Sequence, residues 1–448
     1  MITRDGPPRA SFRRVDLRRT IPAEVSSAGT AALRARLPRP AAVDAPPVAV
    51  VAAICDEVRS GGDEAVRAIT RRIDGCELPE LRIDATQGEQ ALDLLDPGLR
   101  AALEVAHRRV GDYHRHTLRA GATWSDGGVV VESLPRAVDR VGAYVPGGAT
   151  PLISSVLMTV VPAKVAGVAE VIVATAPAAD GRPAPGILAA AALAGADEVI
   201  VGNSSALIAA MAYGTETIGR VDVIVGPGGA YTAQAKREVA ARGLVGVPGS
   251  FAGPSEVVVV ADGSVVPEQA AVDLIVQIEH GPDGLAWLVC WSEEVAEAIE
   301  RMVEKLAAAS ARRDVIEKNL STNSYTALVD GPSEAIAVAN AIAPEHLQLM
   351  VEDPRALLPA VRHAGAVFCG VFSPASVGDY VAGPSHVLPT FGSARFSGAL
   401  GVSDFQRRIH AVTVDRAAVA SLGPAVIALA EAEGLAAHAD SIRLRLGE

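Results

Sequence analysis

The chain has 448 residues, of which 50% are apolar, and its 42 Gly and 29 Pro are spread along it. This composition is typical of a globular protein with two or more cores, not of a disordered or fibrous one. Acidic residues outnumber basic ones by 52 to 40, for a formal charge of -12, which argues against a nucleic-acid-binding protein. The four cysteines lie far apart, which favours free thiols in a reducing compartment.

The beginning of the chain shows no apolar segment typical of a secretory signal. The most apolar stretch, residues 152–178, is interrupted by Pro162, Lys164 and Glu170. A membrane span needs ~20 mostly apolar residues, so this stretch is expected to be a helix followed by a buried strand. We therefore expect a soluble, cytoplasmic protein with no membrane partner.

The first part of the chain is predicted to be an arm followed by helices. Residues 1–40 are rich in Arg, Pro and Ser and are expected to form an arm or a small lead-in domain. A helix is predicted from Pro46, because apolar residues recur at helical spacing until Gly61 and Gly62. A second helix is predicted over residues 97–118.

After Ala143 helical stretches alternate with short β-branched runs, which indicates βαβ units and buried parallel sheets. The predicted strands are 171–174, 198–201, 221–225, 257–261, 286–290, 324–329 and 366–369. We predict an α/β fold of two doubly wound, incomplete Rossmann-like domains, with a helical C-terminal tail over residues 401–448. The main domain is expected to combine residues 41–143 and 257–400, with residues 144–256 as an inserted domain.

Gln277 and His280 form the first candidate site, near the end of a helix that Pro267 begins. Residues three apart share one helix face, so the amide oxygen and an imidazole nitrogen could reach one cation. The alternative is a polar helix end with a His near the negative pole of the helix dipole.

Glu345 and His346 form the second candidate, an acid and an imidazole that could serve as two proton-transfer groups. The alternative is the N-terminus of a helix with an acid in its first turn. Asp379 and His386 lie in a segment rich in Gly, Pro and Ser, which is either a site loop or a capped turn.

Weaker candidates are the segment from Glu433 to His438, the turn containing Ser255, and two Gly-rich turns. The turn Gly226–Gly229 follows a predicted strand and precedes a helix, an arrangement that can cradle a phosphate. The dinucleotide fingerprint GxGxxG is absent, because Tyr231 occupies the position of its last Gly. Each of these segments can also be an ordinary turn or helix end.

Six motifs occur in one order between Arg140 and His438: RVGAYVPGG, AGPSEV, QIEHGPD, APEHL, SVGDYVAGPSHVLPT and AEAEGLAAH. Together they resemble the histidinol dehydrogenase family. The resemblance implies an enzyme of histidine biosynthesis that oxidises L-histidinol to L-histidine through a bound aldehyde, in a four-electron reaction that consumes two NAD.

The resemblance also implies one zinc ion per subunit and a homodimer whose active sites are shared, with the last metal ligand supplied by the partner. The implied site residues are the metal ligands Gln277, His280, Asp379 and His438, the acid–base residues Glu345 and His346, the substrate contacts Ser255, His386 and Glu433, and the cofactor contacts Tyr144 and Gly228.

The chain departs from the family pattern mainly on the cofactor side. Ser205 replaces a Gln and Gly229 replaces an Asn, while Pro384 and Ser385 replace the residues that usually precede His386. Loss of two side-chain hydrogen bonds would weaken NAD binding by roughly 5- to 100-fold. Two alternatives therefore stay open: a paralogue that oxidises another small polar alcohol, and a non-catalytic homologue with impaired NAD binding.

Overall fold

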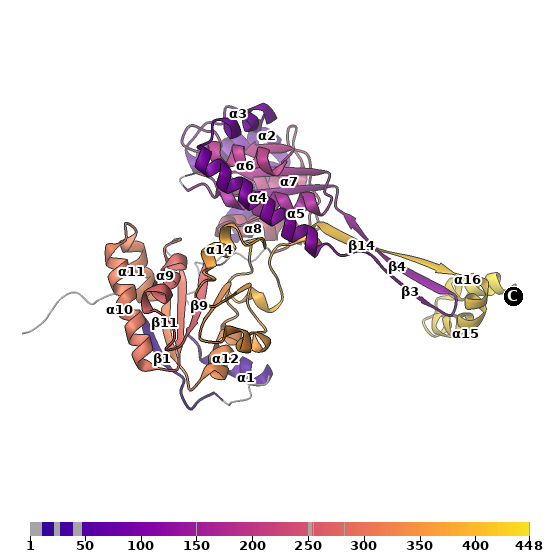
Figure 1. The fold of residues 1–448 in the computed structure, drawn as a ribbon. Coiled ribbons are helices and arrows are strands. Elements are labelled where there is room, and N and C mark those ends of the chain that lie inside the picture. Colours follow the sequence, from indigo (N-terminus) through magenta and orange to yellow (C-terminus); the bar gives the residue numbers. More distant parts are fainter. Residues whose placement is uncertain are drawn as a thin grey trace, which may run out of the picture.

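The computed structural model describes residues 11–21, 27–38, 47–148, 150–249, 253, 255–281 and 283–447. They form two α/β lobes and a long arm that extends away from both and carries the C-terminal helices at its tip (Figure 1). We call these parts the five-stranded lobe (47–117 and 140–249), the six-stranded lobe (11–38 and 255–399, as far as described) and the arm (118–139 and 406–447). The parallel sheets of both lobes confirm the predicted α/β class.

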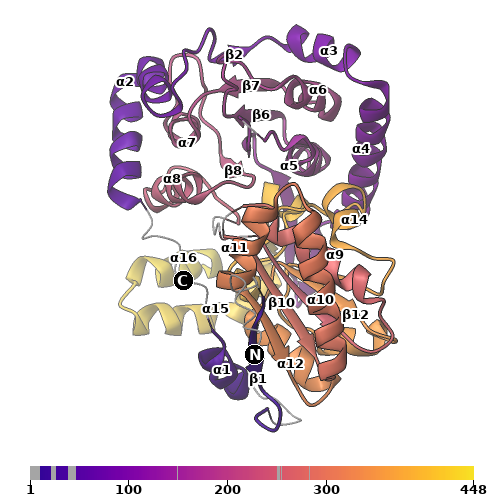
Figure 2. The same cartoon turned by 90° about the vertical axis from the view of Figure 1, so that its left-hand side faces the viewer.

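The five-stranded lobe is a sheet with helices on both faces (Figure 2). Its strands, in spatial order, are β2 (Arg82–Ile83), β7 (Glu198–Val201), β6 (Glu170–Thr175), β5 (Arg140–Val145) and β8 (Val223–Val225), and only β2 is antiparallel. One face carries α2 (Val48–Asp74), α7 (Ser204–Tyr213) and α8 (Ala230–Ala241); the other carries α3 (Ala85–Asp93), α4 (Pro97–Thr117), α5 (Ile153–Val165) and α6 (Pro185–Ala194). Because both faces are covered, the central strands are almost continuously apolar.

The six-stranded lobe is an entirely parallel sheet. Its strands, in spatial order, are β1 (Arg13–Asp16), β11 (Ser324–Leu328), β10 (Leu285–Cys290), β9 (Glu256–Ala261), β12 (His346–Met350) and β13 (Ala366–Cys369). Successive residues of a strand point to opposite faces. Accordingly, Val257 and Val259 pack with α9 (Pro267–Ile278), α10 (Glu293–Ala309) and α11 (Arg313–Asn323). Val258 and Val260 pack with α1 (Ser27–Arg36) and α12 (Pro332–Ile342).

Short elements complete the second half of the six-stranded lobe and lead into the arm. They are α13 (Pro354–Leu357), η1 (Leu358–Ala360), α14 (Ala375–Tyr380), η2 (Ser393–Arg395) and η3 (Val402–Phe405). The arm itself is an antiparallel sheet of β3 (Ala122–Asp126), β4 (Val129–Ala137) and β14 (Gln406–Val414), followed by α15 (Arg416–Ala432) and α16 (Ala436–Leu446).

The arm exposes large apolar side chains to an unusual extent. Val412, Leu429 and Leu444 are 62%, 67% and 76% exposed, and Trp124 on β3 is 59% exposed. Large apolar side chains that gather on an exposed element can mark a contact with another protein surface.

The predicted strands are confirmed as β6 to β11 and β13, but the predicted division into domains is wrong. Residues 47–117 of the expected main domain belong with the expected insert, because α2 packs on α7 and α8, α3 on α6, and α4 on α5. Nor do the described residues of the N-terminal segment form a separate domain, since β1 pairs with β11 and α1 packs on α12. Residues 1–10, 22–26 and 39–46 of these expected domains lie outside the described residues.

Three local predictions also need correction. The segment after Gly401 is not purely helical: β14 precedes α15, and it was missed because it is exposed along most of its length and lacks an apolar face. Pro424, which predicts the start of a helix because Pro suits a first helical turn, lies inside α15 instead. Gly62 does not end the first helix but kinks α2, with a φ of 54°. Within the described ranges, no helix combines the length and apolarity needed to cross a membrane.

Candidate active site

A cavity of about 370 Å³ lies between the two lobes, and the ends of both sheets line it. From the five-stranded lobe come Pro146 and Gly226, which follow the carboxyl ends of β5 and β8. From the six-stranded lobe come Ser255 and Glu345, which precede the amino ends of β9 and β12. The cavity is therefore positioned to receive one molecule from each side.

On the five-stranded side the cavity lies at a point where the strand order reverses. From β5 the chain proceeds outward through β6 and β7, then crosses back to place β8 on the other side of β5. Doubly wound sheets bind ligands at the carboxyl ends of strands that flank such a reversal. The topology thus favours a cofactor site next to β5 and β8.

The turn from Gly226 to Gly229 joins β8 to the N-terminus of α8 and lines the cavity. A Cβ on Gly228 would lie 2.6 Å from Thr232, so the close packing of this turn requires glycine. Free amide groups and the positive pole of the helix dipole make a helix N-terminus suitable for a phosphate. Gly229 is the N-cap of α8, with an extended backbone, and a Cβ there would meet no atom within 4 Å.

The two other residues of the predicted cofactor side are buried behind this turn. Burial raises the pKa of Tyr144, while side-chain hydrogen bonds with Thr232 and Ser204 oppose the shift. Ser205 is buried in the first turn of α7, and its Oγ donates to the carbonyl oxygen of Tyr231 at 3.4 Å. Ser205 therefore contributes to the packing of α7 against α8.

Lys236 is a cavity residue that the sequence analysis missed. It lies on α8, is 3% exposed, lines the cavity, and its Nζ donates to the carbonyl oxygen of Gly226. Burial lowers its pKa to about 7. The signal in the sequence was the position of Lys236, which lies four residues after Thr232 and three before Val239 and therefore on the buried face of α8.

On the six-stranded side, His346 is held between two polar groups. Its Nε2 lies 3.3 Å from Oδ1 of Asp379, on α14, and its Nδ1 lies 3.2 Å from the carbonyl oxygen of Glu256. The imidazole also stacks on Phe368, with 5.9 Å between ring centroids. Glu345 and His346 do not begin a helix, as one prediction had it. His346 is the first residue of β12, because the apolar residues after it pair with β9 and β13.

Glu345 is held by a reciprocal pair of hydrogen bonds with Glu256, a second residue that the sequence analysis missed. The backbone N–H of Glu256 donates to Oε2 of Glu345, and the N–H of Glu345 donates to Oε1 of Glu256, both at 3.1 Å. Burial raises the pKa of Glu345 to about 7 and that of Glu256 to about 8, and the charge of Glu345 adds to the latter shift. A carboxyl group with a pKa near neutrality is suited to acid–base chemistry.

His346 has a pKa raised to about 9. Burial alone would lower it, but the charge of Glu345 and the hydrogen bond to Asp379 outweigh burial. The two carboxylates therefore favour the protonated form of this imidazole.

Gln277 and His280 lie where α9 ends. Gln277 is in the last turn and only 2% exposed, while His280 lies just beyond the helix C-cap, Glu279, and not on the helix itself. Nδ1 of His280 lies 2.7 Å from the carbonyl oxygen of Val276, which fixes the ring and leaves Nε2 for a ligand. A backbone carbonyl bonded to the second ring nitrogen is the usual support of a metal-binding His.

His386 lies between the two groups of residues. Its Nδ1 is 2.8 Å from the backbone oxygen of Asp379, and its Nε2 is 2.9 Å from Oγ of Ser155. Burial lowers its pKa, and the charges of Asp379, His346 and His280 also act on it. His386 lines the cavity between the lobes together with His280, and a neighbouring cavity together with Asp379. Ser385, next to it, packs structurally, since its Oγ donates to the carbonyl oxygen of Met158 at 2.8 Å.

The structure does not bring Glu433 and His438 to this site. Both are exposed, one at the C-cap of α15 and the other in the first turn of α16, at the tip of the arm (Figure 1). Accordingly, no group of three or more His, Cys, Asp and Glu side chains able to hold a metal occurs among the described residues of one chain. Gln277, His280 and Asp379 supply oxygen and nitrogen donors of the kind that zinc accepts, one short of a set of four.

Comparison with known proteins gives a consistent result. The family model described as histidinol dehydrogenase matches residues 38–446. The histidinol dehydrogenase of Thermus thermophilus is 45% identical over 400 residues, covering 88% of this chain and 94% of its own. That of Methanosarcina mazei is 41% identical over 400 residues, covering 89% and 91%. The crystal structure of histidinol dehydrogenase from Elizabethkingia anophelis matches with a TM-score of 0.90 and 30% identity, covering 98% of both chains. The similarity thus extends over both lobes and the arm.

Proposed function

Because the chain belongs to the histidinol dehydrogenase family, a family of NAD-dependent oxidoreductases, we propose that it oxidises L-histidinol to L-histidine in two steps with a bound zinc ion. The observation that carries the proposal is the placement of Glu345 on the wall of the cavity between the lobes, next to His346, whose Nε2 lies 3.3 Å from Oδ1 of Asp379. On the opposite wall, the turn before α8 is the proposed binding site for the phosphates of NAD.

Gln277, His280 and Asp379 are the proposed metal ligands within one chain, with His438 of a second copy as the fourth. A zinc ion bound there would orient the substrate through its amino and imidazole nitrogens. Ser255 and His386 line the cavity and are the proposed substrate contacts, together with Glu433 of the second copy. A cation on Asp379 would also withdraw the carboxylate charge that raises the pKa of His346, which would allow the imidazole to act as a base.

In the first step, His346 accepts the proton of the substrate alcohol while a hydride leaves for NAD, which gives an aldehyde. Glu345 then takes a proton from water as the water attacks the aldehyde carbon, which gives a hydrate. After His346 has released its first proton to solvent, it accepts a proton from this hydrate while a second hydride leaves for another NAD. The balance is one alcohol, one water and two NAD⁺ converted to one carboxylate, two NADH and three protons.

The proposal of a homodimer with shared sites is supported by the arm. It projects from the lobes, exposes large apolar side chains, and carries the two proposed site residues that one chain does not bring to its own cavity. A second cavity, of about 560 Å³, adjoins the site and is lined by Asp379, His386 and the 92% exposed Phe372. The arm of a second copy could reach the metal-binding residues through it.

The test is NADH formation from L-histidinol by the purified protein, before and after treatment with a chelator. We expect activity to be lost on chelation and restored by zinc. No NADH with zinc present would refute the proposed function, and full activity after chelation would refute its metal dependence. A panel of small polar alcohols belongs in the same experiment, because Ser205 and Gly229 favour a paralogue as the second candidate. A clear preference for an alcohol other than histidinol would establish that candidate.

A further inference from the structure

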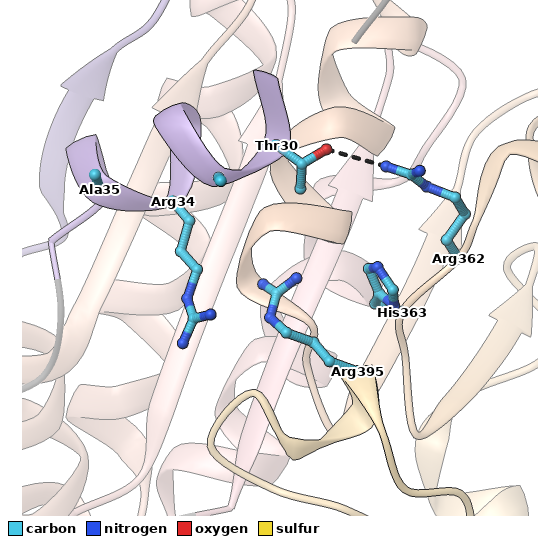
Figure 3. A pocket seen from close by; sticks show the side chains of 7 residues that line it. Thr30, Arg34, Ala35, Arg362, His363 and Arg395 are labelled. Carbon is cyan, nitrogen blue, oxygen red and sulfur yellow. Dashed lines mark hydrogen bonds between the residues drawn. The ribbon is translucent and has the colours of Figure 1, made fainter. Parts of the chain in front are cut away.

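A basic pocket of about 390 Å³ lies on the six-stranded lobe, away from the residues of the proposed reaction. Arg34 of α1, Arg362 and His363 of the segment before β13, and Arg395 of η2 point into it (Figure 3). Among the residues that the structure describes, its lining includes no Asp or Glu. Four basic side chains from three separate segments therefore converge without an acidic partner in the lining.

The pocket is built into the fold and is not a chance gathering of surface side chains. Nη2 of Arg362 donates to Oγ1 of Thr30 at 3.0 Å, which ties its segment to α1. The backbone N–H groups of Arg362 and His363 both donate to Oδ1 of Asn340, at 2.7 and 3.2 Å. Arg395 donates through Nη2 to the carbonyl oxygen of Ala341 at the end of α12. Each wall is thus anchored to α1 or to α12.

The positive charges of the pocket repel one another, because no acidic residue in the described part of its lining neutralises them. Burial lowers the pKa of Arg395, and the nearby charge of Arg34 lowers it further. Burial likewise lowers the pKa of His363, with added repulsion from Arg395 and Arg362. In addition, Nε of Arg395 is buried and has no hydrogen-bond partner among the described residues. A bound anion would relieve this repulsion, and guanidinium groups match the geometry of phosphate and carboxylate oxygens.

We propose that this pocket binds the phosphate group of a small molecule, with Arg34, Arg362 and Arg395 as its cationic ligands. Its volume exceeds that of one phosphate ion, so it accommodates a phosphate with part of the molecule that bears it. The site is separate from the turn at Gly226–Gly229, which belongs to the other lobe.

The bound group would lie close to the residues that support the proposed catalytic pair, Glu345 and His346. A smaller cavity of about 100 Å³ shares Arg34 with the pocket and extends to Glu256. The segment that leads to Arg395 begins at Phe391, whose N–H donates to Oε1 of Glu256 at 2.9 Å. A ligand on Arg395 would therefore order the same segment that supports Glu256 and, through it, Glu345.

The experiment is calorimetric titration of the full-length protein with inorganic phosphate and with pyrophosphate, in the presence of saturating NAD so that the cavity between the lobes is occupied. Arg34→Glu is the test variant, because Arg34 is exposed and no hydrogen bond or ion pair joins its side chain to another of the described residues. Arg36→Glu is the matched control, since Arg36 is exposed on the same helix but does not line the pocket. Melting curves without ligand check that both variants fold, with Arg34→Ala as a milder replacement.

We expect saturable binding to the wild type, at least ~10-fold weaker binding to Arg34→Glu, and binding to Arg36→Glu within about twofold of wild type. Citrate serves as the carboxylate probe and is expected to bind more weakly than pyrophosphate. Tighter binding of citrate would overturn the assignment to phosphate. Absence of saturable binding, or equal weakening by both Glu variants, would overturn the site itself.

Discussion

The two walls of the cavity between the lobes differ in how much chemistry their side chains carry. Glu345 lies on the six-stranded wall with Glu256 and His346 buried next to it, and the pKa values of all three are shifted. The five-stranded wall is made of glycines, prolines, two apolar side chains and one buried amine, Lys236. A residue that transfers protons needs one particular kind of side chain. A wall that binds its ligand through backbone groups, in contrast, tolerates replacement of its side chains. One departure from the family pattern, Gly229, lies on the five-stranded wall, and another, Ser205, is buried behind it.

The largest expected effect concerns His438, which lies on neither wall of its own chain. His438→Ala should abolish histidinol oxidation, because the proposed zinc site loses its fourth ligand. His410→Ala, an exposed His on β14 of the same arm, should leave activity unchanged. The measurement is NADH formation with zinc present, and full activity of His438→Ala would show that the tail has another role.

A mixed dimer sharpens this test. One subunit carries His438→Ala and the other carries His280→Ala, and the two are co-expressed with different tags and purified as the heterodimer. If sites are shared, one of the two sites keeps every ligand, so about half of the wild-type activity should return. An inactive heterodimer would mean that each chain completes its own site.

His346→Ala tests the six-stranded wall. Removal of a positioned general base typically costs 10²–10⁴-fold in rate, so kcat should fall by roughly that factor with little change in the affinity for NAD. His116→Ala, at an exposed position on α4, is the control. A loss below about tenfold would remove His346 from the proposed proton transfers.

Gly229→Asn tests the five-stranded wall. The backbone there is extended and a Cβ meets no atom within 4 Å, so the Asn typical of the family fits without strain. One regained hydrogen bond should tighten NAD binding by roughly 2- to 10-fold, measured by calorimetry. Gly398→Asn, at another open position on the six-stranded lobe, should have no effect. Unchanged affinity in Gly229→Asn would mean that NAD binds elsewhere.

The smallest effect concerns stability, on the six-stranded lobe. Burial raises the pKa of Asp273 to about 6, and its Oδ2 accepts a hydrogen bond of 2.6 Å from Nε2 of Gln348. A raised pKa in the folded state means that the contribution of Asp273 to stability is full below about pH 4 and is lost as pH rises through about 6. Asp273→Asn removes the buried charge and offers a donor to Oε1 of Gln348, which is buried without a partner among the described residues.

Asp273→Asn should therefore stabilise the protein at pH 8 by up to roughly 2–3 kcal/mol, and the gain should shrink as pH falls toward 5. Thermal denaturation at several pH values measures this difference, with the exposed Asp314→Asn as control. A gain that does not depend on pH would exclude charge burial as its cause.

Local sequence predicted the elements better than it predicted their assembly. The β-branched runs predicted strands such as β9 correctly, because a strand buried on both faces must be apolar. Local sequence could not assign α2, α3 and α4 to a lobe, because that choice depends on contacts between distant segments. The strands of the arm escaped notice because β14 is mostly exposed and has no apolar face.

The same limit applied to the candidate site. Gln277, His280, Glu345, His346 and Asp379 are predictions from motifs, and the structure places His346 beside Asp379 and brings His280 and His386 to one cavity. Lys236 and Glu256 were missed, because a single charged residue in sequence is usually exposed and only the tertiary structure shows that these two are buried. The start of β12 was read as a helix start because pairing with β9 and β13 is not visible in five residues.

The projecting arm has a kinetic consequence. If each cavity needs the tip of another chain's arm, the number of complete sites depends on the association of two chains. Specific activity should therefore fall on dilution once the protein concentration drops below the dissociation constant of the dimer. Conversely, substrate and metal that bridge two chains would hold them together, and an excess of either should protect the protein against dilution.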